Sequence, residues 1–314
     1  MSENKHKEHK LISYYKQLDT DISQEEISNQ FDNLVRLIHA QEVKKKRQRL
    51  WISSIIATAA ILVFGIFLFH KDTDSNSLMD YVEMLYANDT ISESSDNGKF
   101  ICMNVPNGCV RQVALPDGSF MKVNAGTTVV YPHDYEFSKE REIYVDGEIF
   151  IDVTRDESKP FIVRTSDLNV TVLGTAFNVA AYKKDHNSEV VLLRGKVSVM
   201  NRYKQEVVLN PDEAVVLTGT NFSQKRSVDA SDYISWTSGR LSFNGKNIQT
   251  IFSELSRFYG VNITYDPEIK DYSLKGTIDL NVSVDKALNR ISKIIPINVF
   301  KKNDGYHLSL IYEE

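Results

Sequence analysis

The feature that most constrains this chain is an uncharged apolar run at residues 50–69. At a helical rise of about 1.5 Å per residue the run extends about 30 Å, which is the thickness of the hydrocarbon core of a bilayer. A buried helix of a soluble domain would carry a polar face, but this run offers only Ser53, Ser54 and Thr58. A cleaved signal peptide is the competing interpretation, which the long preceding segment and the lack of a small-residue cleavage site disfavour. The run predicts one membrane-spanning helix.

The flanks of the run predict its orientation. Basic residues crowd the entry side, at Lys44, Lys45, Lys46, Arg47 and Arg49. On the exit side only Lys71 follows closely, with Asp72 and Asp74 after it. Because positively charged flanks stay in the cytoplasm, we expect residues 1–49 to be cytoplasmic and residues 70–314 to be exported.

Charge and residue usage argue against two functional classes. The formal net charge is -5, and no basic stripe interleaved with aromatic residues occurs outside the juxtamembrane cluster, so direct nucleic-acid binding is not expected. The seven histidines have no ligand spacing with one another or with the cysteines, so neither a metal site nor a cofactor is expected. Residues 1–49 are near the lower limit for burying a core, whereas residues 70–314 suffice for two domains.

The two cysteines, Cys102 and Cys109, flank a Pro-Asn-Gly sequence at residues 106–108 that could turn the chain back on itself. A disulfide across two paired strands is one possibility in an exported domain. Two free apolar thiols in such a strand pair are the other, and sequence spacing does not decide between them.

The predicted cytoplasmic segment is polar and has a helical pattern. Ser23 and Glu26 have the spacing of a capping box, which predicts the start of a helix near residue 23. An apolar stripe then recurs at steps of three and four residues, through Ile27, Phe31, Leu34, Val35 and Ile38. The stripe either packs on a short first helix of the same segment or binds a partner protein. Two short helices bury little surface against the entropy of ordering them, which favours a partner.

Residues 70–99 predict a polar stalk around one short helix. Asp, Ser, Asn and Thr dominate both ends of this stretch. In its middle, five residues fit one apolar face of a helix, namely Leu78, Tyr81, Val82, Leu85 and Tyr86.

Residues 100–220 predict an all-β roll, barrel or sandwich. Runs of β-branched and aromatic residues are interrupted by turn residues at intervals of roughly ten. Asp117-Gly118 and Asp146-Gly147 suit type I′ hairpin turns, because glycine accepts positive φ at little cost. The carboxylates beside the second of these turns, Asp146 and Glu148, are expected to be solvated or to cap the turn.

Residues 236–314 predict a small α+β domain. Strands at 240–243 and 261–265 enclose a helix marked by apolar residues from Ile248 to Phe258. A second unit follows, with a strand at 274–280, a helix from Val284 capped by Ser283, and closing strands at 297–300 and 306–312. The whole chain is thus predicted to be a multidomain single-pass membrane protein with a short helical N-terminal segment, an all-β exported domain and an α+β C-terminal domain.

Conventional catalytic motifs are absent from the sequence, with no phosphate-binding glycine loop, His-Glu-x-x-His or Gly-x-Ser-x-Gly, so an enzyme is not expected. Gly174-Thr175 is the one pair that could carry chemistry. A glycine in a strand usually marks a bulge or the close approach of another backbone. Alternatively, the Thr175 hydroxyl could attack the preceding carbonyl, giving an ester that water cleaves, with Gly174 leaving that carbonyl accessible.

Several stretches between residues 100 and 200 resemble FecR-type regulators, in the order found in that family. They are residues 105–108, 115–119, 123–126, 131–132, 141–150, 159–161 and 172–182. The sequences at 236–243 and 255–261 are similar to the C-terminal domain that accompanies them in Bacteroidetes members, a domain similar to the short N-terminal domain of secretins and TonB-dependent transducers. The N-terminal segment departs from the family, because it lacks the helix-rich pattern with a central Trp that many Bacteroidetes members carry.

This resemblance implies an anti-sigma factor of the bacterial inner membrane. The segment 1–49 would bind an extracytoplasmic-function (ECF) sigma factor through Ile27, Phe31, Leu34 and Ile38. The periplasmic part would receive a signal from a TonB-dependent outer-membrane transducer, with docking residues in the C-terminal domain at Leu241, Phe243, Leu255, Phe258 and Tyr259. In several relatives the pair matching Gly174-Thr175 is a self-cleavage point. A protein of another class, a membrane-anchored module that binds a periplasmic glycan or peptide, is the alternative.

Overall fold

A computed structural model describes residues 77–89, 94–185 and 187–311. The predicted cytoplasmic segment, the apolar run at 50–69 and the four predicted sigma-binding residues (Ile27, Phe31, Leu34 and Ile38) lie outside these ranges. Within them, no helix is both long and apolar enough to cross a membrane.

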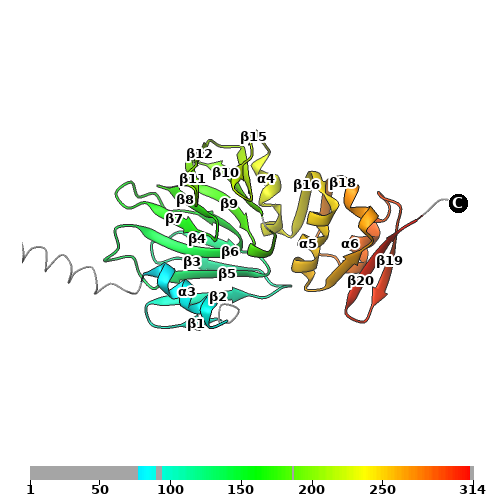
Figure 1. Cartoon of the computed structure of the whole chain (residues 1–314), viewed down its shortest axis with the longest axis horizontal. Helices are drawn as coiled ribbons and strands as arrows, with labels where there is room; N and C mark the ends of the chain where they lie inside the picture. The colour runs from blue at the N-terminus through cyan, green and yellow to red at the C-terminus, as the bar shows by residue number, and fades with distance from the viewer. Residues whose placement is uncertain (1–76, 90–93, 186, 312–314) are drawn as a thin grey trace, which may run out of the picture. The chain divides into compact units, whose positions relative to one another are not determined.

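The helix predicted in the middle of the stalk is confirmed as α3 (Leu78–Ala87). Ser77 and Asp80 form a reciprocal capping box at its start, which satisfies two backbone amides that have no partner in the helix. Its apolar face is buried in one cluster with Phe100, Val130 and Tyr144 of the β domain. This part of the stretch therefore belongs to the folded domain and is not a free spacer (Figure 1).

The β-rich domain predicted after this helix is confirmed. Its strands are β1 (Ser95–Asp96), β2 (Phe100–Val105), β3 (Arg111–Ala114), β4 (Phe120–Val123), β5 (Thr127–Pro132), β6 (Arg141–Asp152), β7 (Phe161–Arg164), β8 (Leu168–Val172), β9 (Ala176–Ala181), β10 (Asn187–Arg194), β11 (Val197–Asn201), β12 (Glu206–Leu209), β13 (Glu213–Thr218), β14 (Asn221–Phe222) and β15 (Arg226–Ser227). The short 3₁₀ helix η1 (Lys183–Asp185) precedes β10. All neighbouring pairs are antiparallel except β6 and β7, which are parallel.

The strands form two halves that share β6. One half has the order β12-β11-β8-β7-β6-β5-β2-β1, and the other joins β3 and β4 through β6 to β9, β10 and β13. Side chains from both halves enter one buried cluster, including Val129 and Val170 from the first and Met121 and Val190 from the second. The two halves therefore face each other across a common core, as in a sandwich (Figure 1).

The predicted hairpin turn at Asp146-Gly147 is wrong, because both residues lie inside β6. Residues 141–146 pair with β7 and β5, and residues 147–152 pair with β9 and β4. Gly147 has φ 137°, and a Cβ there would lie 2.6 Å from the Cα of Thr127. The glycine thus allows one long strand to pass from one half of the domain to the other where β5 approaches closely.

Cys102 and Cys109 are not joined in a disulfide, and the predicted strand pair that would carry them is wrong. Strand β2, which contains Cys102, pairs with β1 and β5, whereas β3 pairs with β4. Residues 106–108 therefore lead the chain from one half of the domain to the other. Cys102 packs under α3, and Cys109 packs against the main core cluster.

The C-terminal part has the predicted α+β character. After α4 (Ala230–Tyr233) and η2 (Ser235–Ser238), its elements are β16 (Arg240–Asn247), α5 (Ile248–Tyr259), β17 (Asn262–Tyr265), η3 (Pro267–Asp271), β18 (Ser273–Asp279), α6 (Val284–Ile291), β19 (Ile297–Lys302) and β20 (Gly305–Leu310). Strands β16 and β18 form one small antiparallel sheet, and β17, β20 and β19 form a second. Both sheets and both helices contribute to one buried cluster.

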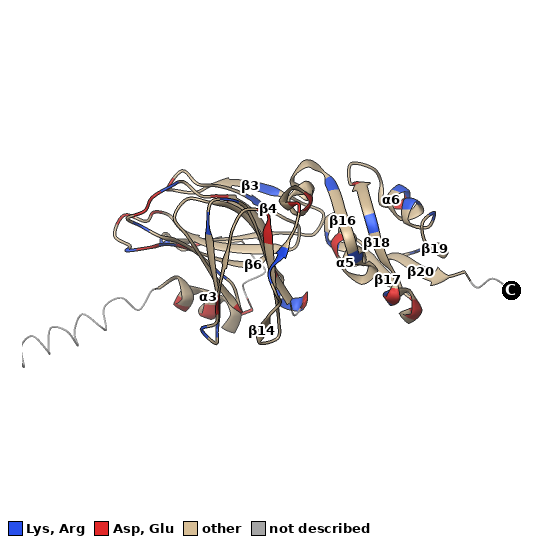
Figure 2. Ribbon diagram, turned by 90° about the horizontal axis from the view of Figure 1, so that it is seen from above, with Lys and Arg blue, Asp and Glu red and all other residues tan. Residues whose placement is uncertain are grey.

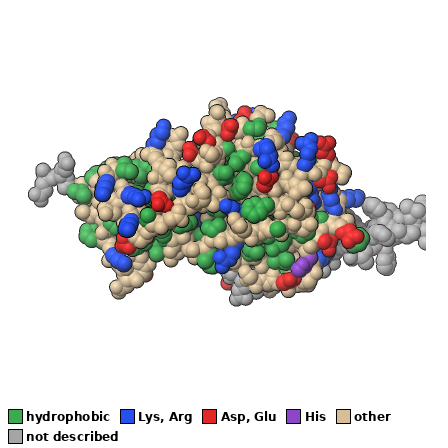
Figure 3. Space-filling view, turned by 180° about the vertical axis from the view of Figure 1, so that it is seen from behind, with side chains coloured by type: hydrophobic (Ala, Val, Ile, Leu, Met, Phe, Trp, Pro, Cys, Tyr) green, Lys and Arg blue, Asp and Glu red, His purple; other side chains and the backbone are tan. Residues whose placement is uncertain are grey.

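Both ends of α5, the helix that carries Glu254 and Arg257, are capped. The side chain of Asn247 accepts a hydrogen bond from the Gln249 amide at the start, and Gly260 ends the helix with φ 66°. Residues of both charge signs are spread along the ribbon in Figure 2, and charged side chains of both signs are interspersed on the face seen in Figure 3.

Candidate functional site at the junction of the β and C-terminal domains

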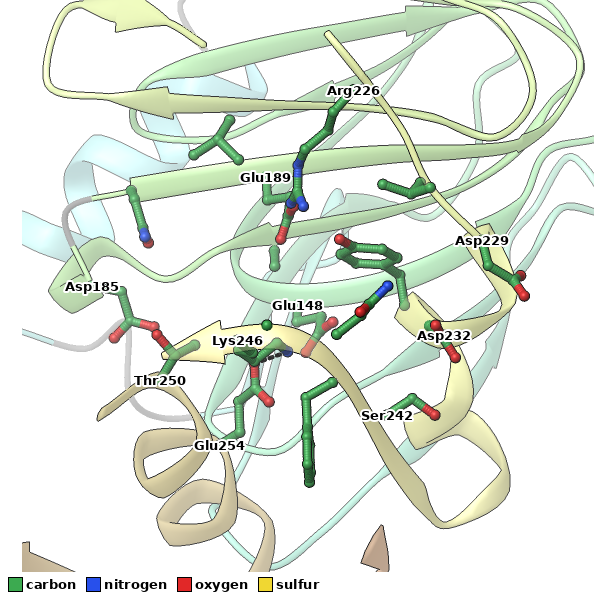
Figure 4. A pocket seen from close by; sticks show the side chains of 18 of the residues that line it. Glu148, Asp185, Glu189, Arg226, Asp229, Asp232, Ser242, Lys246, Thr250 and Glu254 are labelled. Carbon is green, nitrogen blue, oxygen red and sulfur yellow. Dashed lines mark hydrogen bonds and ion pairs between the residues drawn. The ribbon is translucent and has the colours of Figure 1, made fainter. Parts of the chain in front are cut away.

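A cavity of about 330 Å³ lies where β-domain residues meet β16 and α5 (Figure 4). Its wall is strongly charged, with acidic side chains in excess. The charged residues that line it are Glu148, Asp185, Glu189, Arg226, Asp229, Asp232, Lys246, Glu254 and Arg257. The cavity therefore gathers charges from distant parts of the chain.

Glu148 is held from the β domain by two amide side chains. Asn124 donates to one carboxylate oxygen at 2.7 Å, and Asn178 donates to the other at 3.0 Å. Burial raises the pKa of Glu148 to about 7, and the negative charge of Glu254 adds to this effect. The two amides and Lys246 act in the opposite direction. The expectation of a solvated or turn-capping Glu148 is therefore wrong, because β6 continues through this position.

Lys246 is the cation nearest the centre of the cluster. Its ammonium group donates to Glu254 at 2.7 Å, and burial alone would lower its pKa. The charges of Glu254, Glu148 and Glu189 outweigh burial and raise the pKa of Lys246. The other carboxylate oxygen of Glu254 is a buried atom without a hydrogen-bond partner. One lysine thus neutralises three carboxylates incompletely.

Glu189 occupies the β-domain side of the cavity on β10. It forms an ion pair with Arg226 of β15. Burial raises the pKa of Glu189, and the charge of Arg226 opposes this. This pair closes the part of the cavity wall that lies next to the linker leading into α4.

Arg257 makes the most extensive contact across the junction. Its guanidinium lies 3.9 Å from the ring centroid of Tyr182 and 3.0 Å from a carboxylate oxygen of Asp185. Its backbone carbonyl accepts a hydrogen bond of 2.8 Å from the amide of Gly108. One residue of α5 is therefore bound to two separate segments of the β domain.

The charged groups of the site form an electrostatic contact between the two domains. Its charged groups pair with one another, and none of the bonds among them joins a nucleophilic hydroxyl or thiol to a base. Within the described ranges, no group of three or more His, Cys, Asp or Glu residues could hold a metal ion.

The pair Gly174-Thr175 lies away from this cavity, between β8 and β9. Gly174 has φ 155°, and a Cβ there would lie 2.6 Å from the Cα of Arg155. This confirms the interpretation that the glycine marks a close backbone approach. Thr175 is 1% exposed, and its hydroxyl donates to the carbonyl of Lys196 at 3.1 Å. Whether the peptide bond is cleaved stays a prediction.

Three of the five predicted docking residues are core residues. Leu241, Phe243 and Leu255 are buried in the main cluster of the C-terminal domain, so their side chains offer no surface to a partner. Phe258 and Tyr259 are partly buried against the same cluster. The apolar periodicity that marked the first three is equally typical of a core, and whether this domain docks on a transducer stays a prediction.

The residues that build the junction were missed by the sequence analysis as functional residues. Arg257 contacts Asp185, which is 72 positions away in the chain. Lys246 and Glu254 belong to the C-terminal domain, and Glu148 and Glu189 belong to the β domain. No local spacing signals such a cluster. The only available signal was the presence of Arg257 within the 255–261 stretch.

Comparisons with known proteins agree with this two-part organisation. The model of the FecR protein family matches residues 103–198, and that of the FecR C-terminal region matches residues 240–308. Two crystal structures of a candidate anti-sigma factor from Parabacteroides distasonis ATCC 8503 are similar, each with a TM-score of 0.64. They are 35% and 36% identical in sequence; the matches cover 68% and 67% of this chain and 100% and 99% of theirs.

A comparison with proteins of curated function found no significant match. The first crystal structure is matched over its whole length at 35% sequence identity. This level of identity indicates a common family and not only a common fold. Both family regions also occur here in sequence order. The chain belongs to the FecR family of anti-sigma factors.

Proposed function

We propose that this protein is a single-pass regulator of the bacterial inner membrane that sequesters an ECF sigma factor and relays a periplasmic signal to it. The signal would come from a TonB-dependent outer-membrane transducer. Membership of the FecR family carries this proposal, because an anti-sigma factor implies a sigma factor as its partner. The exported part would then be the receiver, and residues 1–49 would be the output.

The chain supports this division of labour through its order of parts. The apolar run at 50–69 separates a short polar segment from the two regions that match the family. A run of this length is typical of a membrane span, and its basic flank favours a cytoplasmic N-terminus. The segment outside the bilayer on the other side contains the β domain and the C-terminal domain, which are joined by the charged junction.

The apolar stripe Ile27, Phe31, Leu34 and Ile38 is the proposed contact with the sigma factor. The double substitution Phe31→Asp with Leu34→Asp places two charges on the stripe and should release the sigma factor. Transcripts of its target genes should then rise in the native host without the outer-membrane signal, and the measurement is their amount relative to the unmodified chain.

A matched control adds the same charge on the other side of the helix. Asn29→Asp with Asn33→Asp introduces two carboxylates roughly opposite the stripe, at positions where a helix faces away from it. This variant should leave transcription at the level of the unmodified protein. Equal transcription from both double variants and the unmodified chain would contradict the assignment of this face.

Affinity capture of a tagged segment 1–49 from the native host tests the partner directly. Co-purification of an ECF sigma factor, identified by mass spectrometry, would support the proposal. If the segment retains no such factor, and if a chain lacking residues 1–40 keeps its cellular role, the anchored glycan- or peptide-binding module becomes the better explanation.

A further inference from the structure

The contact between the C-terminal domain and the β domain depends on few residues. Arg257 binds Tyr182, Asp185 and the Gly108 amide, as described above. Lys122 of β4 donates to the carbonyl of Thr237 at 2.9 Å. Trp236 donates through its indole nitrogen to Asn178 at 3.3 Å. These contacts are polar, so the stability of the junction depends on the charges around them.

Glu148 lies at the point where these contacts meet. Asn178 joins it to Trp236, because the same amide donates to Glu148 and accepts from the indole. The ionisable groups around Glu148 come from four elements and one loop. They are Glu189 of β10, Asp232 and Tyr233 of α4, Lys246 of β16, Glu254 and Arg257 of α5, and Tyr182 after β9. Glu148 and Glu254 therefore face each other across the junction, and their charges repel. Lys246 is bonded to Glu254, and further acidic groups lie nearby.

We propose that this junction is a proton-operated latch, in which a proton on Glu148 holds the C-terminal domain against the β domain and its loss weakens that contact. When Glu148 is protonated, it no longer repels Glu254, and the charge of Lys246 acts on Glu254 and Glu189 alone among the three carboxylates. An ionised Glu148 adds a third carboxylate to an environment with little water. The latch does not depend on the identity of the sigma factor or of any periplasmic partner.

The direction of the pH effect follows from linkage. The pKa of Glu148 is raised from 4.5 to about 7, first by burial and then by the charge of Glu254. The docked state therefore binds the proton more tightly than a state in which Glu148 faces water. Docking is strongest below pH 4.5, the ordinary pKa of the carboxyl group, and weakens as the pH rises through about 7. The equilibrium constant for docking can change by at most about 300-fold between these limits.

Trp236 provides a built-in reporter of the latch. It is 6% exposed at the junction, and Trp51 is the other tryptophan of the chain. The full chain with Trp51→Phe, reconstituted in lipid nanodiscs, then has one tryptophan. Quenching of its fluorescence by acrylamide should be lowest near pH 4.5 and should increase as the pH rises to above 7, because opening of the junction exposes the indole.

Two variants test whether Glu148 is responsible. In Glu148→Gln the amide cannot ionise, so quenching should stay low across the whole pH range. In Glu157→Gln, whose side chain is 65% exposed in a surface ion pair, the pH dependence of the parent should persist. Far-UV circular dichroism at each pH establishes that the variants are folded. If Glu148→Gln is not folded, Glu254→Gln replaces it and should reduce the increase in quenching, because ionised Glu148 then no longer faces a carboxylate.

Two results would overturn the latch. One is quenching of Trp236 that does not change with pH in the parent protein. The other is a transition in folded Glu148→Gln that matches the parent, since the titrating group would then be a different one.

Discussion

Replacing Arg141 by Met should destabilise the β domain by about 3 kcal/mol. The guanidinium is almost fully buried, donates to Asp117 at 2.7 Å, and donates to the carbonyls of Thr154 and Lys159 at 2.9 Å each. Methionine keeps an apolar side chain of similar length but leaves the Asp117 carboxylate and both carbonyls without these donors. Breaking a buried pair from one side typically costs about 3–5 kcal/mol. The lower end applies because the amide and hydroxyl of Ser119 still donate to Asp117.

Urea unfolding of residues 77–314 measures this cost. The crystallised relatives match about two thirds of this chain over nearly their full length, so a part of about this size is expected to fold without the rest. With a denaturant slope of about 2–3 kcal/mol/M, a loss of about 3 kcal/mol lowers the midpoint by about 1 M. The matched control is Arg155→Met, which removes an exposed arginine paired with Glu157 and should change stability by less than about 1 kcal/mol.

The outcome separates the two electrostatic environments. Midpoints of Arg141→Met and Arg155→Met that lie within about 0.2 M of each other would refute the reasoning, because buried and exposed arginines would then contribute equally. The double variant Asp117→Asn with Arg141→Met should recover part of the loss, since it removes the uncompensated charge as well as the cation.

Two further predictions concern Gly147 and the Gly174-Thr175 pair. Gly147→Ala should cost about 3 kcal/mol in the same urea assay, because the added Cβ meets Thr127 at a backbone conformation that other residues rarely adopt. Gly118→Ala, where the nearest atom would lie 3.6 Å away, shares the cost of positive φ but lacks that clash, so it should cost less. If self-cleavage occurs, wild type and Thr175→Ser should give two fragments on a denaturing gel and Thr175→Ala one polypeptide; an uncut wild type in its native host would show that the chain is not processed there.

Local patterns predicted the elements whose neighbours are close in sequence. The apolar spacing of α3 and α5 and the presence of a turn at Asp117-Gly118 agree with the structure, because each depends on contacts within a few residues. The predicted type I′ geometry of that turn is wrong, because only Gly118 of the two residues has a positive φ. Asp146-Gly147 has the same local signal as Asp117-Gly118 but lies inside a strand. The difference arises from Thr127 of β5, which lies so close to β6 that a glycine is required at position 147. The residues beside Gly147 in the sequence do not indicate this contact.

Periodicity also could not distinguish a core from a docking surface. Leu241, Phe243 and Leu255 recur on one face of their elements, and the structure places that face against the second sheet and helix of the same domain. A single sequence indicates that these side chains avoid water. It does not indicate whether their own domain or a partner protein covers them.

The candidate site was the least predictable part, because its contacts join residues far apart in the chain. Arg257 and Asp185 are separated by 72 positions, and Trp236 and Asn178 by 58. Each of these residues has a common structural role when considered alone. Their combination becomes visible only when the fold brings α5 against the segments around Gly108 and Tyr182.

Residues 146–148 connect these findings within one strand. Asp146 accepts hydrogen bonds from the Tyr86 hydroxyl of α3 and from the Lys183 amide, while Glu148 faces Glu254 of α5. Gly147 lies between them, where β6 passes from one half of the β domain to the other. The same strand therefore presents one carboxylate to α3 and the next to the C-terminal domain. Because the position of Gly147 is fixed by Thr127, neither carboxylate can shift far without moving the strand that both halves of the core share.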